Sequence, residues 1–276
     1  IASQLDHRFD LLAATRRSDR RHVSLLTTLD WSYDLLARRE QTVLDSLAVF
    51  AGPFTLDDAR RLWALVPGGY DDAEVAAAVG ALVDKSLLAV HDQRQTTRYR
   101  LLDTVRAYCR EHLSATGSLS EWRHRHCQYV IELTERADRG VRGPGEVEWV
   151  RTLDEHLGDL RAAHAALAAD HDVDGLVRLC TSLKWYADPR SRPVVQRWAS
   201  DLVVAARADL ADHPLFPRLL AMAAMAAIAR GDLDAAEQLA DDADVAGNGE
   251  LGDGLGMLAR VDLFRGRLDA ARRAVH

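Results

Sequence analysis

Hydrophobic positions in the first 116 residues change from a helical period to an alternating one. Apolar residues recur every three or four positions in four stretches that we expect to be helical: 23–36, 40–50, one after Thr55, and one from Asp71 or Asp72 to Asp84. Residues 87–91 and 97–102 then read as strands around a turn at 92–96, and a further helix runs from Asp103 to about Leu113. Three helices followed by a β-hairpin is the order of a winged helix, although an unrelated α+β unit could share it. We therefore predict a winged-helix domain over residues 21–116.

Two local signals refine this prediction. Thr55 should cap its helix, because Asp57 and Asp58 follow in the first turn, where the helix dipole favours acidic side chains. In the hairpin, Leu88 and Leu101 should face the core, against Val79 and Leu82 of the preceding helix.

From Ser120 to His276 the pattern is helical throughout, with breaks at 140–145, 188–193, 212–217 and 247–254. Trp149, Leu153, Leu157 and Leu160 should line one helix, and Leu176, Leu179, Leu183 and Trp185 another. Near the end, the segments 231–236 (GDLDAA) and 266–271 (GRLDAA) are nearly identical and lie 35 positions apart. This period is typical of tetratricopeptide-type helical hairpins, with Gly231 and Gly266 in the turns and the small Ala236 and Ala271 where helices cross.

The predicted fold is therefore mainly α: a winged helix, then a tetratricopeptide-like solenoid over 117–276. An ordinary alanine-rich helical bundle is the alternative. The chain stops within the second helix of the last copy, so we expect the array to be truncated there.

Composition limits the function. The net charge of −7 disfavours nucleic-acid binding by the chain as a whole, because phosphate contacts need clustered positive charge. Cys109, Cys127 and Cys180 form neither a disulfide framework nor a zinc pattern, which favours a reducing cytoplasm. No apolar run is long enough to cross a membrane. No nucleophile–base or paired-carboxylate arrangement supports an enzyme.

Four motifs, in this order along the chain, carry a family resemblance: 29–36 (LDWSYDLL), 47–56 (LAVFAGPFTL), 82–88 (LVDKSLL) and 99–108 (YRLLDTVRAY). Together they resemble the region after the nucleotide-binding module of bacterial STAND (NB-ARC-type) ATPases, including the AfsR-like and large LuxR-like regulators of actinomycetes. The stretch from Glu148 to Leu167 resembles the start of that family's helical sensor region. The resemblance implies that residues 1–20 end the nucleotide-binding assembly and its linker.

A P-loop needs a lysine that follows a glycine, and neither Lys85 nor Lys184 does. The chain should thus hold no cofactor of its own, and the resemblance places ATP or ADP on an upstream domain. Related regulators carry a Met-His-Asp triplet whose His touches the β-phosphate of ADP, and the matching positions here are Leu101, Leu102 and Asp103. The resemblance makes Asp103 the candidate cofactor-binding residue, while Leu102 cannot donate the hydrogen bond of the His. As a local alternative, Asp103 could simply cap its helix.

Other signals are weaker. Glu121, His124, His126 and Cys127 are potential metal ligands, but on a helix His126 points away from His124 and Cys127, so we predict no metal site. Four tryptophans should be packing anchors: Trp122, Trp149, Trp185 and Trp198. The basic residues 16–22 are more typical of a solvated linker loop than of a nucleic-acid contact.

Two functions remain. The first is the regulatory arm of a STAND switch that controls transcription. In it a winged helix transmits nucleotide state from the upstream domain, and the repeats bind a protein or small-molecule signal. Oligomerisation on activation is a further expectation. The second is a DNA-binding winged-helix regulator with a repeat oligomerisation tail. We favour the first, without direct DNA binding, because the candidate recognition helix carries Asp71, Asp72, Glu74 and Asp84 against the single cation Lys85.

Overall fold

The computed structural model describes residues 19–93, 96–188, 192–247 and 253–275. The chain is mainly helical, as predicted, and divides into two compact units between Arg125 and His126. Most of residues 1–20, where the resemblance places the end of the nucleotide-binding assembly, lies outside the described residues. Among the described residues, no helix combines the length and the apolar character needed to cross a membrane.

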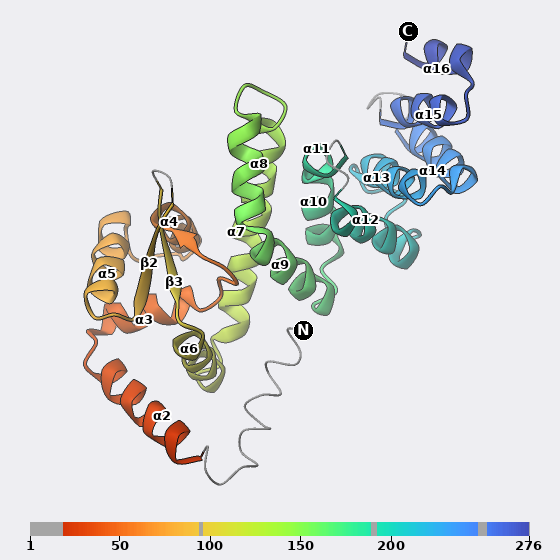
Figure 1. Ribbon diagram of the computed structural model, residues 1–276. Coiled ribbons are helices and arrows are strands. Elements are labelled where there is room, and N and C mark those ends of the chain that lie inside the picture. Colours follow the sequence, from red (N-terminus) through yellow and green to blue (C-terminus); the bar gives the residue numbers. More distant parts are fainter. Residues whose placement is uncertain (1–18, 94–95, 189–191, 248–252, 276) are drawn as a thin grey trace. The chain divides into compact units, whose positions relative to one another are not determined.

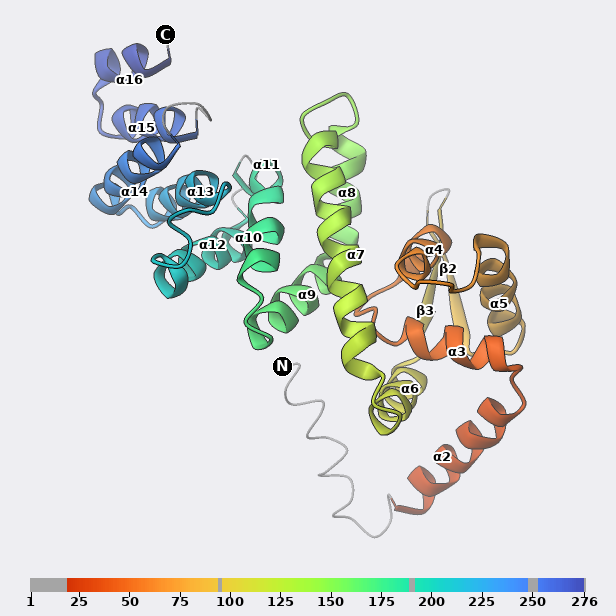
Figure 2. The same cartoon turned by 180° about the vertical axis from the view of Figure 1, so that it is seen from behind.

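The first unit contains the predicted winged helix (Figure 1). Its elements, in chain order, are α2 (Asp19–Asp34), α3 (Arg38–Leu47), β1 (Phe54–Thr55), α4 (Leu56–Ala64), α5 (Asp72–Asp84), β2 (Leu88–Gln93), β3 (Thr96–Leu101) and α6 (Asp103–Ala115). The three strands form an antiparallel sheet in the order β1-β3-β2. Figure 2 shows this unit from behind, with α3, α4 and α5 gathered around the hairpin.

The hairpin register confirms the predicted core. Leu88 pairs with Leu101 across the two strands, and both side chains are buried together with Val79 and Leu82. Thr55 caps α4 as expected: its hydroxyl accepts a hydrogen bond from Asp58 N, and the Asp58 carboxylate accepts one from Thr55 N. This reciprocal capping box fixes where α4 begins.

One prediction for this unit needs correction, and two of its features were not predicted. The helix predicted from residue 23 begins at Asp19, so part of the expected basic loop is helical. Strand β1 was not predicted. Two residues are too short to show an alternating pattern, and its partners Arg98 and Tyr99 lie more than 40 positions away. The compact unit also extends past residue 116, because Trp122 in α7 (Leu119–Gly140) packs against Trp63 of α4 with ring centroids 5.1 Å apart.

The second unit consists of successive helices. After the rest of α7 come α8 (Glu146–Glu155), α9 (Leu157–Ala169), α10 (Val173–Ser182), α11 (Lys184–Ala187), α12 (Pro193–Ala206), α13 (Phe216–Ala229), α14 (Leu233–Ala246), α15 (Asp253–Phe264) and α16 (Leu268–Val275). The predicted single helix through Trp149, Leu153, Leu157 and Leu160 is wrong, because a turn at His156 separates α8 from α9. Likewise Leu183 ends α10, and Trp185 belongs to the short α11.

The two copies of the repeat form the same turn. Gly231 and Gly266 have φ angles of +78° and +74°, the left-handed region in which glycine carries no steric cost. After each glycine the next amide bonds back to the preceding helix: Asp232 N to Ala227 O at 3.0 Å, and Arg267 N to Asp262 O at 2.8 Å. The α9–α10 connection makes this turn too, with His171 at φ +55° and Asp172 N bonded to Leu167 O. Among the described residues of the second unit, this turn therefore joins two helices three times, once without its glycine.

Candidate functional site

The recognition helix of a winged helix corresponds to α5. Its start is fixed by a second capping box, in which Asp71 and Glu74 each accept a hydrogen bond from the other's backbone N–H, at 2.8 and 3.0 Å. Val75, Ala78, Val79 and Leu82 are buried, which leaves the opposite side of the helix for contacts with a partner.

The side chains on that outward side of α5 are small or acidic. Its exposed or half-exposed residues are Asp72, Ala73, Glu74, Ala76, Ala77, Gly80, Ala81, Val83 and Asp84. Within α5, which is described in full, none is Arg, Lys, Asn or Gln, the side chains that read base edges in a major groove. Two neighbouring cations are paired with carboxylates, Arg39 with Glu74 and Lys85 with Glu40, both at 2.5 Å. The α5 surface is therefore poorly suited to a polyanion.

The wing adds little positive charge among the described residues. Arg98 is buried, and its Nη2 donates to the carbonyl of Pro53 at 3.2 Å, so it helps hold the sheet together. Arg100 is exposed but lies 3.4 Å from the Asp103 carboxylate. The wing tip at residues 94–95 lies outside the described residues. Over residues 36–114 the sequence has ten Arg and Lys against eleven Asp and Glu.

Asp103 occupies the first turn of α6, and the prediction that it caps this helix is wrong. The cap position belongs to Leu102, which has extended backbone and makes no side-chain cap hydrogen bond. Asp103 is instead the first helical residue, where the helix dipole stabilises its negative charge. Its exposed carboxylate lies 3.4 Å from both Arg100 and Arg106. The side chain is open to a partner, and a nucleotide contact stays a prediction.

A buried polar cluster in this unit escaped the sequence analysis. Tyr33 Oη of α2 donates to Asp45 Oδ2 of α3 at 2.7 Å, and His112 Nδ1 of α6 lies 2.8 Å from the same oxygen. Burial raises the pKa of the Asp45 carboxyl above its ordinary value, although the hydrogen bonds from Tyr33 and His112 oppose this. The pKa of Tyr33 is also raised, by burial first and by Asp45 second. The three residues tie α2 to the winged helix. A carboxylate inside the apolar run Val43–Leu47 was the only sequence signal.

The residues considered as metal ligands serve other contacts. Glu121 pairs with Arg125 at 2.5 Å, and the buried His126 Nε2 lies 3.0 Å from Asp159 Oδ1. The Cys127 thiol faces the carbonyl of Ala163 at 3.8 Å. Across the described parts of the chain, no group of three or more His, Cys, Asp or Glu is placed to hold a metal ion.

The tryptophans differ in environment. Trp122 is buried, and Trp198 stacks on His164 with ring centroids 4.3 Å apart. The ring of Trp149 lies so close to Gly140 that a side chain there would overlap it. Trp185 is 38% exposed, with the Lys184 ammonium 4.7 Å from its ring centroid. The prediction of packing anchors therefore fits the first three better than Trp185.

Comparison with known proteins identifies the domain. Residues 36–114 match the family model of a winged helix-turn-helix domain. The chain is 33% identical over 189 residues to mycobacterial proteins that carry the name of HTH-type transcriptional regulators: Mb0914c of Mycobacterium bovis and Rv0890c of Mycobacterium tuberculosis. This match covers 67% of the chain and 21% of each relative. An uncharacterized protein of M. tuberculosis, Rv0894, is 34% identical over 147 residues, which are 51% of this chain and 37% of that protein.

These matches show a winged-helix protein related to transcriptional regulators. The chain spans about a fifth of the length of the regulators that it matches. No solved structure matches it.

Proposed function

We propose that this chain is the regulatory and sensor arm of a STAND-type signal-transduction ATPase that controls transcription. In this proposal an upstream module holds ATP or ADP, and residues 1–20 end that module. The winged helix transmits the nucleotide state, and the helical hairpins bind a protein or small-molecule signal in the cytoplasm. The chain itself catalyses no reaction.

The observation that carries the proposal is the outward face of α5. In a DNA reader this face would present donors to phosphates and base edges. Here it presents alanines and a glycine between acidic ends, and the neighbouring Arg39 and Lys85 are neutralised by ion pairs. Such a surface suits contact with another protein surface better than contact with a nucleic acid. The winged helix thus fits an adaptor between modules, which is its place in the STAND proteins that the four sequence motifs resemble.

The alternative is a DNA-binding winged-helix regulator whose helical hairpins serve as an oligomerisation tail. The match to a winged helix-turn-helix domain and the names of the mycobacterial relatives favour it. The two functions differ in whether this chain binds DNA, which a mobility-shift assay at near-physiological salt measures.

We expect no complex at micromolar concentrations of the chain. Ala73→Arg with Ala77→Arg provides the matched control, because both positions are exposed on α5 and the variant adds cations without touching the core. That variant should gain weak, salt-sensitive binding, which would show that the assay detects contacts made by α5. A nanomolar, sequence-specific complex of the unaltered chain would instead establish the alternative.

Nucleotide binding tests the placement of the ATPase module. Calorimetric titration of the chain with ADP should show no tight binding, and micromolar affinity would contradict the proposal. In the longer protein that includes the upstream module, Asp103→Ala should change the affinity for ADP if this position reads the nucleotide. Asp84→Ala, on another exposed carboxylate, in α5, should not. Equal effects of both substitutions would exclude a specific role for Asp103.

A further inference from the structure

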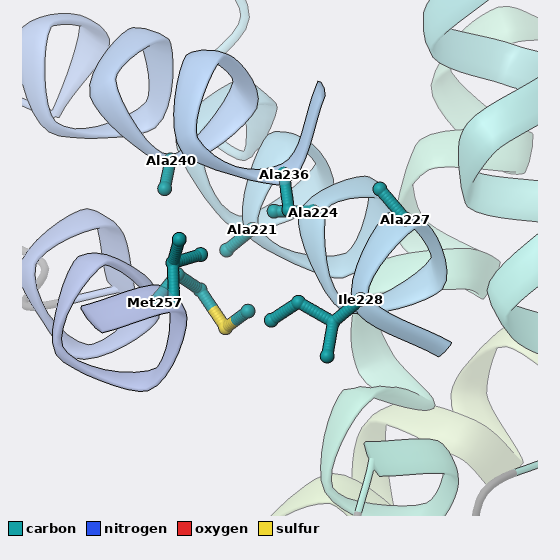
Figure 3. Packing of buried hydrophobic residues seen from close by; sticks show 8 residues of the cluster. Ala221, Ala224, Ala227, Ile228, Ala236, Ala240 and Met257 are labelled. Carbon is teal, nitrogen blue, oxygen red and sulfur yellow. The ribbon is translucent and has the colours of Figure 1, made fainter. Parts of the chain in front are cut away.

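The hairpin of α13 and α14 packs against α15 in a way that defines a seat. The seat is the buried cluster in which alanines of α13 and α14 pack with Met257 and Val261 of α15. Figure 3 shows Met257 beside these alanines. Its floor and edge consist of Ala221, Ala224, Ala227 and Ile228 of α13 with Ala236 and Ala240 of α14. Small residues let α15 lie close, and the two side chains that it inserts are one helical turn apart.

The same positions recur 35 residues later on α15 and α16. Ala221, Ala224 and Ala236 correspond to Gly256, Ala259 and Ala271, so three floor positions stay small. The other two differ, because Ala227 and Ala240 correspond to Asp262 and Val275. The apolar edges are kept as well, because Ile228 and Leu233 correspond to Leu263 and Leu268. Exposure differs sharply: Ile228 is 9% exposed under α15, whereas Leu263 and Leu268 are 57% and 55% exposed. Phe264, beside Leu263, is 63% exposed.

We propose that the face formed by Gly256, Ala259, Leu263, Leu268 and Ala271 seats the first helix of one further hairpin of the same repeat type. The occupant is an amphipathic helix that inserts two apolar side chains, four residues apart, as α15 does one repeat earlier. The argument rests on the internal repeat and does not depend on the proposed function.

Charge specifies the occupant further. Glu237 of α14 pairs with the hairpin seated on it, through Arg265 at 3.0 Å and Arg267 at 2.6 Å. The residue 35 positions after Glu237 is Arg272, which is exposed. The acidic residue of this contact is therefore replaced by a basic one on the exposed face of α15 and α16. The occupant should carry an acidic side chain at the position that corresponds to Arg267.

The test uses a capped peptide of residues 253–267, which contains α15 and the following turn. It is titrated into the isotope-labelled chain and followed by NMR. We expect saturable shifts confined to α15 and α16, with weak affinity because an isolated helix of this length is marginal in water. Leu263→Asp in the chain should lower the affinity at least about tenfold, as burying an unpaired charge requires. The matched control is Val245→Asp, at a side chain of α14 that is 78% exposed, and it should have no effect.

A charge exchange tests the register. The peptide with Arg267→Glu should bind about two- to fivefold more tightly than the native peptide, the range expected of an exposed ion pair. Arg272→Glu in the chain should reverse this preference.

Three outcomes would overturn the proposal: no saturable binding, shifts on α13 and α14 that indicate displacement of α15, or no response to the charge exchange. Dimerisation of the chain in sedimentation experiments, abolished by Leu263→Asp, would assign the face to a second copy and overturn it as well.

Discussion

The close approach of α15 to α14 predicts opposite effects for two glycines in one helix. A methyl group added at Gly254 would lie 2.4 Å from the backbone nitrogen of Asp244 and 2.6 Å from its Cα. At Gly256, two residues further on, the added methyl group would have no atom within 4 Å. Gly254→Ala and Gly256→Ala therefore add the same group to the same helix, and only the first meets a neighbour.

The expected magnitudes follow from this geometry. Non-bonded atoms prefer separations of about 3.5–4.0 Å, so α15 must withdraw from α14 by roughly 1 Å to accept the methyl group at Gly254. Overpacking of this kind costs about 1–3 kcal/mol, and the withdrawal also weakens the contacts of Met257 and Val261. Gly→Ala inside a helix gains up to about 1 kcal/mol. The net expectation is a loss of about 1–2 kcal/mol for Gly254→Ala and a gain of up to about 1 kcal/mol for Gly256→Ala.

Amide hydrogen exchange measured by mass spectrometry gives the local readout. Peptides from α14 and α15 should exchange about tenfold faster in Gly254→Ala for each 1.4 kcal/mol lost, and equally fast or slower in Gly256→Ala. Peptides from α3 in the other unit serve as the internal reference. Unchanged exchange in Gly254→Ala would refute the reasoning, because α14 and α15 would then not approach as closely as described.

Two further substitutions test the winged helix. Leu101→Ala should lower the free energy of unfolding of this unit by about 2–5 kcal/mol in chemical denaturation, because Leu101 is fully buried. Val90→Ala, at an exposed position of β2, should have little effect. Equal losses in the two variants would contradict the hairpin register. Asp45→Asn tests the polar cluster: burial raises the pKa of Asp45 in the folded state, so its contribution is fully present below the ordinary carboxyl pKa of about 4 and is lost as pH rises through the raised value. Denaturation from pH 4 to pH 7 should therefore show Asp45→Asn gaining stability relative to the unaltered chain, and a constant difference across that range would exclude the effect.

The order of the helices and the β-hairpin in the winged helix could be predicted because each has a local signal. Thr55 and Asp71 mark helix starts, and the apolar period changes after Asp84. Other elements lacked such signals. The apolar spacing continues across the turn at His156, so α8 and α9 were predicted as one helix. The α9–α10 hairpin was hidden because His171 takes the positive φ that glycine takes in the other two copies.

The candidate sites were less predictable than the fold, since they depend on contacts between distant residues. The ion pairs of Arg39 and Lys85 join positions that lie 35 and 45 residues apart. The Tyr33–Asp45–His112 cluster brings together three helices. Asp103 was placed in the correct turn from sequence, but a shift of one residue decides between a cap and a first-turn position.

The match to a winged helix-turn-helix domain and the acidic, alanine-rich surface of α5 are compatible, because the first concerns the fold and the second the side chains. A domain description specifies how elements are arranged, whereas DNA reading depends on the side chains that the recognition helix presents. The relatives' name refers to whole proteins of which the matched segment is 21%. Contact with DNA can therefore belong to another part of such a protein. The alanines and glycine of α5 permit the close approach that α13, α14 and α15 achieve with the same residue types. The outward face of α5, with small side chains between acidic ends, therefore fits a protein surface that offers cations at its edges. The proposed regulatory arm requires such a contact between proteins.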